Sequence, residues 1–275
     1  MIAFLAIAGL LTAPVCAPPL GADVLLSQPQ RIIVLGESHG TVEAPDAFLG
    51  IVCEAAQQGP VTVGLEMPES DRSLLDFVMT APDEATAMRI LRNGDFGDPR
   101  REDGRHSQAM FDMIIGFWRL KAAGHDIVLR PFAPRMSVIR GRDQAWWELE
   151  MAYGMSRPLI DRPQARLLIL VGNLHARKTR IERIPDVGLP AAGHLHAADT
   201  LTLNIAQQGG DAWNCQETCG VHPTRGVYDP EARGVILQPS DDGAFDGVLA
   251  LGPSTASPLA AAPSQPATMS SGSSS

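Results

Sequence analysis

The 275-residue sequence has no lysine- or arginine-rich segment, and its formal net charge is -9. Proteins that bind nucleic acid neutralise phosphates with clustered basic side chains, so this composition disfavours nucleic acid as a partner. The sequence also lacks an HExxH motif and a C-x-x-C-H haem-attachment motif. These absences exclude two compact signatures, but a dispersed divalent-metal site and non-covalent haem binding stay open. Hydrophobic residues make up 45% of the chain, which is typical of a globular protein.

No basic residue precedes Arg31, yet residues 1–13 are apolar and uncharged. This run is too short to span a bilayer as a helix and resembles the apolar region of a signal peptide. Small residues allow cleavage after Ala17 or Ala22. We therefore predict a signal peptide at 1–22, a periplasmic or secreted location, and no stable membrane insertion after leader removal. A buried N-terminal helix is the alternative, and Cys16 lacks the lipobox pattern expected of a lipid anchor.

The chain has only four cysteines, and two of them, Cys215 and Cys219, are close enough to bridge across a turn. A disulfide there requires an oxidising compartment, which agrees with export. The alternative is half of a zinc site completed by His222, but a single C-x3-C pair is a weak metal signal. We predict the disulfide.

Short apolar runs alternate with helical patterns, which favours an open, mainly parallel α/β sheet flanked by helices. The predicted strands are 31–35, 61–65, 126–130, 166–171 and 201–205, followed by 235–238 and 247–251. The predicted helices are 45–57, 71–79, 83–91, 107–122 and 137–153, with Asp71 and Asp83 as N-caps. The irregular segment 93–105 is a candidate lid. One domain at 23–252 and a flexible Ala/Pro/Ser-rich tail at 253–275 complete the predicted organisation.

Acidic and imidazole side chains follow three of these strands. Glu37 and His39 come after the first strand, Glu66 ends the second, and Asn173 and His175 follow the fourth. Ligands bind at the carboxyl ends of the strands in open α/β sheets, so we predict that these groups converge there. Titratable groups placed together perturb one another's pKa values, which is how a site obtains an acid and a base near neutral pH.

The sequences GESHG at 36–40 and GNLH at 172–175, together with Glu66, resemble the signature blocks of the erythromycin esterase and ChaN-like superfamily, to which the TIKI-type metalloproteases are related. The segments 103–110 and 212–215 are similar to blocks of an uncharacterised bacterial branch of it. The resemblance implies a doubly wound sheet and a hydrolytic role in which His39 is the general base, with Glu43 and Glu66 at matching positions. This chain has one residue fewer between Gly36 and the histidine than the esterases, so macrolide hydrolysis is not implied.

The residues themselves indicate a mechanism. His39, oriented by Glu37 or Glu66, takes a proton from water, and His175 or Arg105 stabilises the resulting oxyanion. The expected substrate is a small molecule with an ester, lactone or amide bond.

Two further predictions concern ligands. Arg105, His106 and Ser107 are candidate substrate-binding residues in one of the similar blocks. The Glu/His cluster is also a candidate divalent-metal site, whose bound water would be the nucleophile. A non-catalytic haem- or metal-binding protein is the alternative function, and haem needs an axial ligand such as His or Tyr beside an apolar face.

Overall fold

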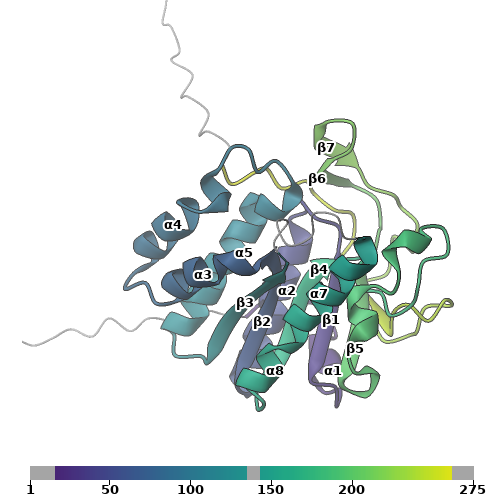
Figure 1. The fold of residues 1–275 in the computed structure, drawn as a ribbon, viewed down its shortest axis with the longest axis horizontal. Helices are drawn as coiled ribbons and strands as arrows, with labels where there is room; N and C mark the ends of the chain where they lie inside the picture. Colours follow the sequence, from purple (N-terminus) through teal and green to yellow (C-terminus); the bar gives the residue numbers. More distant parts are fainter. Residues whose placement is uncertain (1–15, 135–142, 262–275) are drawn as a thin grey trace, which may run out of the picture.

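The computed structural model describes residues 16–134 and 143–261 (Figure 1). Residues 1–15 of the predicted signal peptide, residues 137–142 of a predicted helix and residues 262–275 of the predicted tail lie outside the described residues. The helices are α1 (Ala22–Leu26), α2 (Glu43–Gln58), α3 (Arg72–Met79), α4 (Glu84–Arg92), α5 (Gln108–Ala122), α7 (Gln144–Ser156) and α8 (Pro158–Asp161). The strands are β1 (Ile32–Glu37), β2 (Val61–Pro68), β3 (Ile127–Ala133), β4 (Arg166–Gly172), β5 (Thr200–Ile205), β6 (Asp211–Cys215), β7 (Cys219–Pro223), β8 (Gly234–Ile236) and β9 (Gly247–Ala250).

Seven strands form an open sheet in the order β3-β2-β4-β1-β5-β9-β8. All neighbouring strands in it run parallel except β8, which pairs antiparallel with β9. Every strand predicted from the sequence corresponds to one of these seven. The predicted fold class, an open and mainly parallel α/β sheet flanked by helices, is confirmed.

The central strand β1 shows why its sequence is apolar at every position. Ile33 and Leu35 pack in the core that also contains the buried residues of α2 and α5. Ile32 and Val34 point to the other face and pack in the core that contains buried residues of α7, which lies in front of the central strands in Figure 1. Successive side chains of a strand alternate between faces, so a strand covered on both sides reads as a continuous hydrophobic run.

One of the two predicted helix caps is formed. The Asp83 side chain accepts a hydrogen bond from the Thr86 amide at 2.7 Å and so caps α4. Asp71 precedes α3 at the N-cap position, but its side chain accepts no capping bond from the described residues. Its prediction as a cap is therefore wrong, because the backbone enters α3 directly from a short 3-10 turn.

A two-stranded antiparallel hairpin, β6–β7, stands apart from the main sheet at the top of Figure 1. Its strands were not predicted, because most of their residues are exposed or partly buried and carry little hydrophobic signal. The predicted disulfide between Cys215 and Cys219 closes its turn. The zinc interpretation of these cysteines is wrong, since their sulfurs are bonded to each other, and His222 bonds instead to the Thr218 carbonyl at 2.9 Å.

A second disulfide joins Cys16 to Cys53 in α2. Cys16 lies within the predicted signal peptide, and this pairing of Cys53 was not predicted from the sequence. Residues following Cys16 also pack: Leu25 and Leu26 are buried, and the Val235 amide donates to the Leu20 carbonyl at 2.8 Å. Cleavage after Ala22 would remove Cys16 and leave Cys53 unpaired.

Replacing both Cys16 and Cys53 with serine is expected to lower the free energy of unfolding by about 2–4 kcal/mol. This disulfide closes a loop with a sequence separation of 37, so it restricts the unfolded chain substantially. The matched control is the double serine variant of Cys215 and Cys219, whose separation is only 4 and whose effect should be smaller. Urea denaturation of both variants measures this, and equal losses would contradict the loop argument.

The folded part of the chain continues beyond the predicted boundary at 252. Thr41 forms an isolated bridge with Ala256, and Ser107 forms one with Leu259. The Ser257 hydroxyl is buried and accepts from the Ala109 amide at 2.9 Å. Residues 253–261 are thus held largely through the backbone and small side chains. Because such contacts need few large apolar residues, the composition of this segment resembles that of a flexible tail.

None of the helices described here is both long enough and apolar enough to cross a bilayer.

Candidate active site

The strands that precede the predicted site residues are β1, β2 and β4, and β4 lies between the other two in the sheet. The groups still converge, because Gly172 at the end of β4 has no side chain. A Cβ there would lie 3.0 Å from Nε2 of His39 and 3.5 Å from Cδ2 of His175. Glycine therefore lets two imidazoles approach the backbone between them, and its amide donates to Oε2 of Glu66 at 2.7 Å.

His39 lies between two carboxylates. Its Nδ1 is 2.9 Å from Oε1 of Glu37, and its Nε2 is 3.5 Å from Oε2 of Glu66. The two glutamate side chains are only 3% and 6% exposed, whereas that of His39 is 26% exposed. Burial alone would lower the pKa of His39, but the charges of Glu66 and Glu37 outweigh it and raise that pKa to about 10. His39 is therefore an imidazolium at neutral pH.

Glu66 is the carboxylate that lies near His39, His175 and Arg105. Burial alone would raise its pKa, but His39, His175 and the Gly172 amide hold the pKa of Glu66 well below its usual range. Nε2 of His175 lies 4.0 Å from Oε1 of Glu66, and Nη1 of Arg105 lies 3.2 Å from the same oxygen. Glu66 is thus an ionised acceptor between three groups that can carry positive charge.

His175 forms a second pair with a carboxylate, on α7. Its Nδ1 lies 2.8 Å from Oε2 of Glu148, which is fully buried. Glu148 also accepts from the Ala191 amide at 3.0 Å and from the Gln144 side chain at 2.8 Å. Three donors thus hold the carboxylate in place and orient the imidazole.

Glu148 is not among the site residues predicted from the sequence. A signal was present, because Glu148 lies three and four positions before the buried residues Met151 and Ala152 and so shares their helix face. A carboxylate on the buried face of a helix needs a partner, and His175 is that partner.

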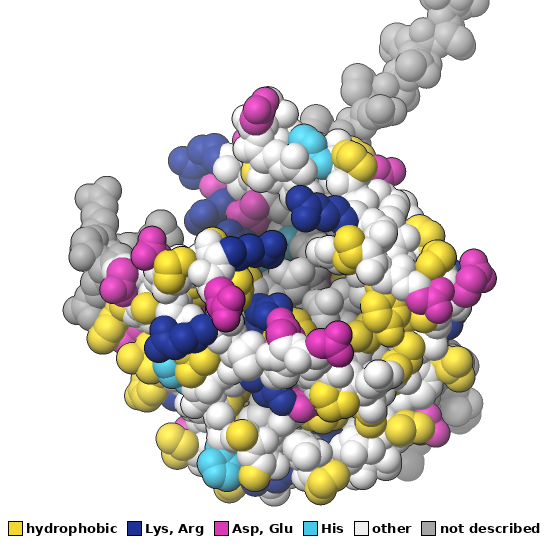
Figure 2. Space-filling view, turned by 90° about the vertical axis from the view of Figure 1, so that its right-hand side faces the viewer, with side chains coloured by type: hydrophobic (Ala, Val, Ile, Leu, Met, Phe, Trp, Pro, Cys, Tyr) yellow, Lys and Arg dark blue, Asp and Glu magenta, His cyan; other side chains and the backbone are white. Residues whose placement is uncertain are grey.

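Arg105 reaches the cluster from the segment that was predicted as a lid. It lies in the short 3-10 turn Gly104–His106, and its guanidinium also pairs with Asp103 at 3.1 Å. Burial alone would raise the pKa of Asp103, but hydrogen bonds with His106 and Arg105 hold that pKa well below its usual range. Figure 2 shows basic side chains around a hollow in one face of the molecule.

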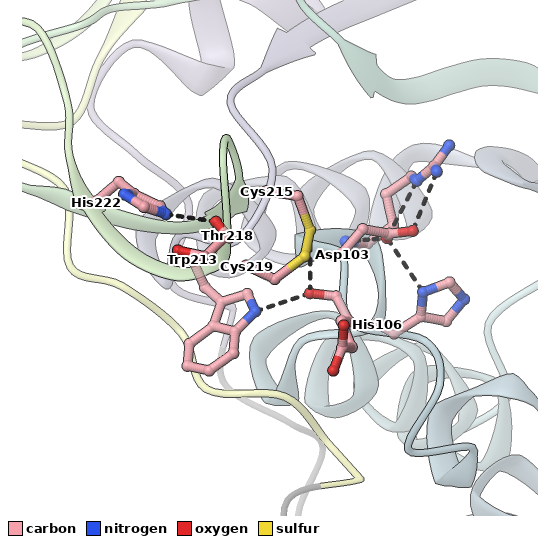
Figure 3. Close-up of a disulfide and its surroundings, with 9 residues drawn as sticks. Asp103, His106, Trp213, Cys215, Thr218, Cys219 and His222 are labelled. Atoms are coloured by element: carbon pink, nitrogen blue, oxygen red, sulfur yellow. Dashed lines mark hydrogen bonds and ion pairs between the residues drawn. A yellow bond between two sulfur atoms is a disulfide. The ribbon is translucent and has the colours of Figure 1, made fainter.

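The β6–β7 hairpin lies beside the segment that contains Asp103 and His106 (Figure 3), and it also contacts the turn that follows His39. The Trp213 amide donates to the Gly40 carbonyl at 2.9 Å, and its indole Nε1 donates to the Glu102 carbonyl at 2.8 Å. A Cβ on Gly104 would lie 2.5 Å from both the Gly40 nitrogen and the Trp213 oxygen, so the three backbones are in close contact. The disulfide-closed hairpin therefore fixes the position of Arg105 relative to His39.

Replacing Trp213 with phenylalanine is expected to loosen the segment around Glu102 and Arg105. The variant keeps the aromatic bulk but removes the indole donor, a loss of about 0.5–1.5 kcal/mol, so amide hydrogen exchange at 102–105 should quicken by roughly two- to tenfold. The matched control is Trp118→Phe, which removes an indole bond of 3.1 Å to Ala81 elsewhere. Unchanged exchange in Trp213→Phe would show that other contacts position this segment.

Two predicted catalytic residues make their hydrogen bonds apart from the ion pairs of the cluster. Glu43 begins α2, and its Oε2 accepts from the Thr255 amide at 2.9 Å, so the structure directs it to the C-terminal segment and does not bring it to His39. The Asn173 amide donates to the Glu37 carbonyl at 2.8 Å, while its side chain lines a neighbouring cavity. Catalytic roles for both stay predictions.

The predicted substrate-binding residues beside Arg105 are buried. Nδ1 of His106 lies 3.2 Å from Asp103, and its ring packs edge-on against Phe96. Ser107 caps α5 by accepting from the Met110 amide at 3.4 Å. Both side chains support the segment that carries Arg105, and of the predicted trio Arg105 is the one that reaches the cluster.

The cluster was also a candidate metal site. Within the described ranges, no group of three or more His, Cys, Asp or Glu side chains has an arrangement that could hold a metal ion. The ion pairs that Glu66 makes with His39 and Arg105 place positive charge where a dication would bind. The donor set therefore does not fit a resident divalent metal.

The sheet order and helix layers define an α/β fold that this chain shares with erythromycin esterase. A mutant of erythromycin esterase EreC in its open conformation matches with a TM-score of 0.61 and 11% identity, covering 86% of this chain and 94% of that chain. A succinoglycan biosynthesis protein matches at 0.55 and 10% identity, covering 87% and 92%, and a Bacillus cereus protein at 0.54 and 13%, covering 86% and 91%. No family model and no curated protein matches the sequence. The fold implied by the sequence resemblance is confirmed, and both hydrolysis and ligand binding are compatible with it.

Proposed function

We propose that this chain is an exported hydrolase that activates water against an ester, lactone or amide bond. The observation that carries the proposal is the pairing of two histidines with carboxylates. His39 and His175 each have Nδ1 on a glutamate and Nε2 facing Glu66, at 3.5 and 4.0 Å. Two imidazoles oriented toward one point, beside the Arg105 guanidinium, are the parts that acid–base hydrolysis needs.

We assign the general base to His175. Its Nδ1 is engaged by Glu148, which directs the lone pair of the neutral imidazole to Nε2. Nε2 lies 4.0 Å from Glu66, beyond hydrogen-bond distance, so it is available to a water molecule. Glu148 is a positioning residue in this scheme, since it orients the ring without touching the substrate.

His39 takes a different role from the one inferred from the sequence. The charges of Glu66 and Glu37 raise the pKa of His39 to about 10, so its imidazole carries a proton at pH 7 and is a poor base in the free protein. As an imidazolium it can donate a hydrogen bond to developing negative charge, as can Arg105. The geometry thus favours exchanging the roles of His39 and His175.

The reaction then proceeds in two steps. The water oxygen attacks the carbonyl carbon while its proton passes to Nε2 of His175, and the carbonyl oxygen becomes an oxyanion that His39 and Arg105 stabilise. Collapse of the tetrahedral intermediate breaks the bond to the leaving group. The leaving oxygen or nitrogen takes the proton from His175, which restores the base.

An exported location is part of the proposal. Two disulfides, Cys16–Cys53 and Cys215–Cys219, are consistent with an environment outside the cytoplasm. Cleavage at either predicted site would remove Cys16, so of the two disulfides only Cys215–Cys219 is compatible with a cleaved leader, and together with the apolar leader it supports a periplasmic or secreted enzyme.

The test is turnover of a panel of p-nitrophenyl esters, lactones and amides by the purified chain with its disulfides intact. We expect hydrolysis above the buffer rate that persists in EDTA, because side chains supply the acid and the base. Loss of activity in EDTA that zinc restores would contradict the proposed chemistry. No turnover across the panel, with a Soret band on haem addition, would favour a haem-binding protein instead.

A further inference from the structure

A cavity of about 280 Å³ lies next to the proposed active centre. It is lined in part by Asn173, Arg177, Arg183, Asn204 and Gln207. Three of these residues connect it to the centre. Asn173 directly follows Gly172 at the end of β4. Asn204 pairs in register with Gly36, which precedes Glu37 and His39 in the chain. The Gln207 side chain donates to the Ser38 hydroxyl at 3.5 Å. A molecule in the cavity would thus lie beside the backbone that carries Glu37 and His39.

Two buried polar atoms on the cavity-lining residues have no hydrogen-bond partner in the described part of the chain. They are Nε of Arg177 and Oδ1 of Asn204. A buried donor or acceptor left unsatisfied is costly, and such groups in folded proteins are usually completed by water or a ligand. These two atoms belong to residues of the lining, so the wall of the cavity carries polar groups that the described side chains and backbone leave unsatisfied.

The charge of the lining specifies the kind of molecule. Two guanidinium groups and three side-chain amides line the cavity, and no carboxylate does so among the residues described. Arg177 is held in place by an ion pair with Asp242 and by the ring of Phe245, 5.6 Å away. Arg183 is exposed and makes no ion pair within residues 16–134 and 143–261. Guanidinium groups match the planar, multidentate geometry of carboxylate and phosphate oxygens.

We propose that this cavity binds an anionic, oxygen-rich group of the substrate, a carboxylate or a phosphate. The substrate of the enzyme is then a negatively charged ester, lactone or amide, whose scissile bond lies at the Glu/His cluster while its anionic end lies between Arg177 and Arg183. The apolar part of the lining, which includes Phe245 and Leu174, contacts the carbon chain between the two. This inference of substrate class rests on the proposed hydrolytic function.

Binding of simple anions tests the cavity without requiring turnover. Isothermal titration of the full chain with succinate and with inorganic phosphate should show saturable binding that Arg183→Ala weakens at least tenfold and Arg183→Glu abolishes. Arg180→Ala is the matched control, because Arg180 is an exposed arginine on the same loop that does not line the cavity. Tighter binding of succinate identifies a carboxylate site, and tighter binding of phosphate identifies a phosphate site. Equal losses in the Arg183 and Arg180 variants, or no binding of either anion, would overturn the proposal.

Turnover separates this inference from the proposed function. The wild type should have a higher kcat/KM for p-nitrophenyl hemisuccinate than for p-nitrophenyl acetate, and Arg183→Ala should lower kcat/KM for the hemisuccinate to about the value for the acetate. Hydrolysis of both esters with no preference and no anion binding would reject the anion site and leave the hydrolase standing. Anion binding that is lost in Arg183→Ala, without hydrolysis of either ester, would reject the hydrolase and leave the anion site standing.

Discussion

Replacing His175 with alanine is expected to lower kcat for ester hydrolysis by about a hundred- to ten-thousandfold, the contribution of one well-placed general base. The proposed base is the Nε2 atom, which lies 4.0 Å from Glu66 and is oriented through Nδ1 by the fully buried Glu148. No other imidazole of the cluster can replace it near pH 7, because His39 is protonated there. Steady-state kinetics on the p-nitrophenyl panel measures the loss.

The control for this variant is His196→Ala. His196 is 74% exposed and pairs with Asp199 on the surface, away from the cluster. Its removal should leave kcat unchanged. Wild-type kcat in a folded His175→Ala protein would show that the base is elsewhere.

Replacing Glu66 with glutamine is expected to lower the pKa of His39 by about one to three pH units, the usual effect of removing an opposite charge at this distance. Glu66 makes the largest of the contributions that raise this pKa, ahead of Glu37. Substitution by the nearly isosteric amide removes the charge while keeping most of the packing. Titration of the His39 ring by NMR measures the shift directly.

The same substitution changes how stability depends on pH. The pKa of His39 is about 10 in the folded chain against an ordinary value of 6.5, so the folded state binds the extra proton between these two values. This stabilisation is fully present below pH 6.5 and is lost as the pH rises toward 10. We therefore expect the free energy of unfolding to fall across that range in the wild type, and more shallowly in Glu66→Gln.

Urea denaturation between pH 6 and pH 10 tests this slope. Glu43→Gln is the control, since Glu43 is a carboxylate that accepts a hydrogen bond from Thr255 and lies outside the cluster. It should leave the pH dependence of the wild type intact. Identical slopes in Glu66→Gln and the wild type would show that Glu66 does not control the protonation of His39.

Much of the fold could be predicted because its central strands are buried on both faces. Such strands read as continuous apolar runs, as β1 and β4 do, and parallel strands place their carboxyl ends at one edge. That geometry is enough to expect Glu37, His39, Glu66 and His175 near one another. The β6–β7 hairpin and residues 253–261 could not be found in the same way, because backbone bridges and a disulfide hold them with little apolar burial.

The sequence alone determined which polar groups lie at the ends of strands. A buried strand consists of apolar residues, so the first polar residues after an apolar run mark its end. Only the tertiary structure decided which of those groups meet. It placed β4 between β1 and β2, brought Glu148 from a helix to His175, and delivered Arg105 on a segment held by Trp213. Protonation depends on distances and burial between residues far apart in the chain, so the change of His39 from expected base to imidazolium appears only when the chain is folded.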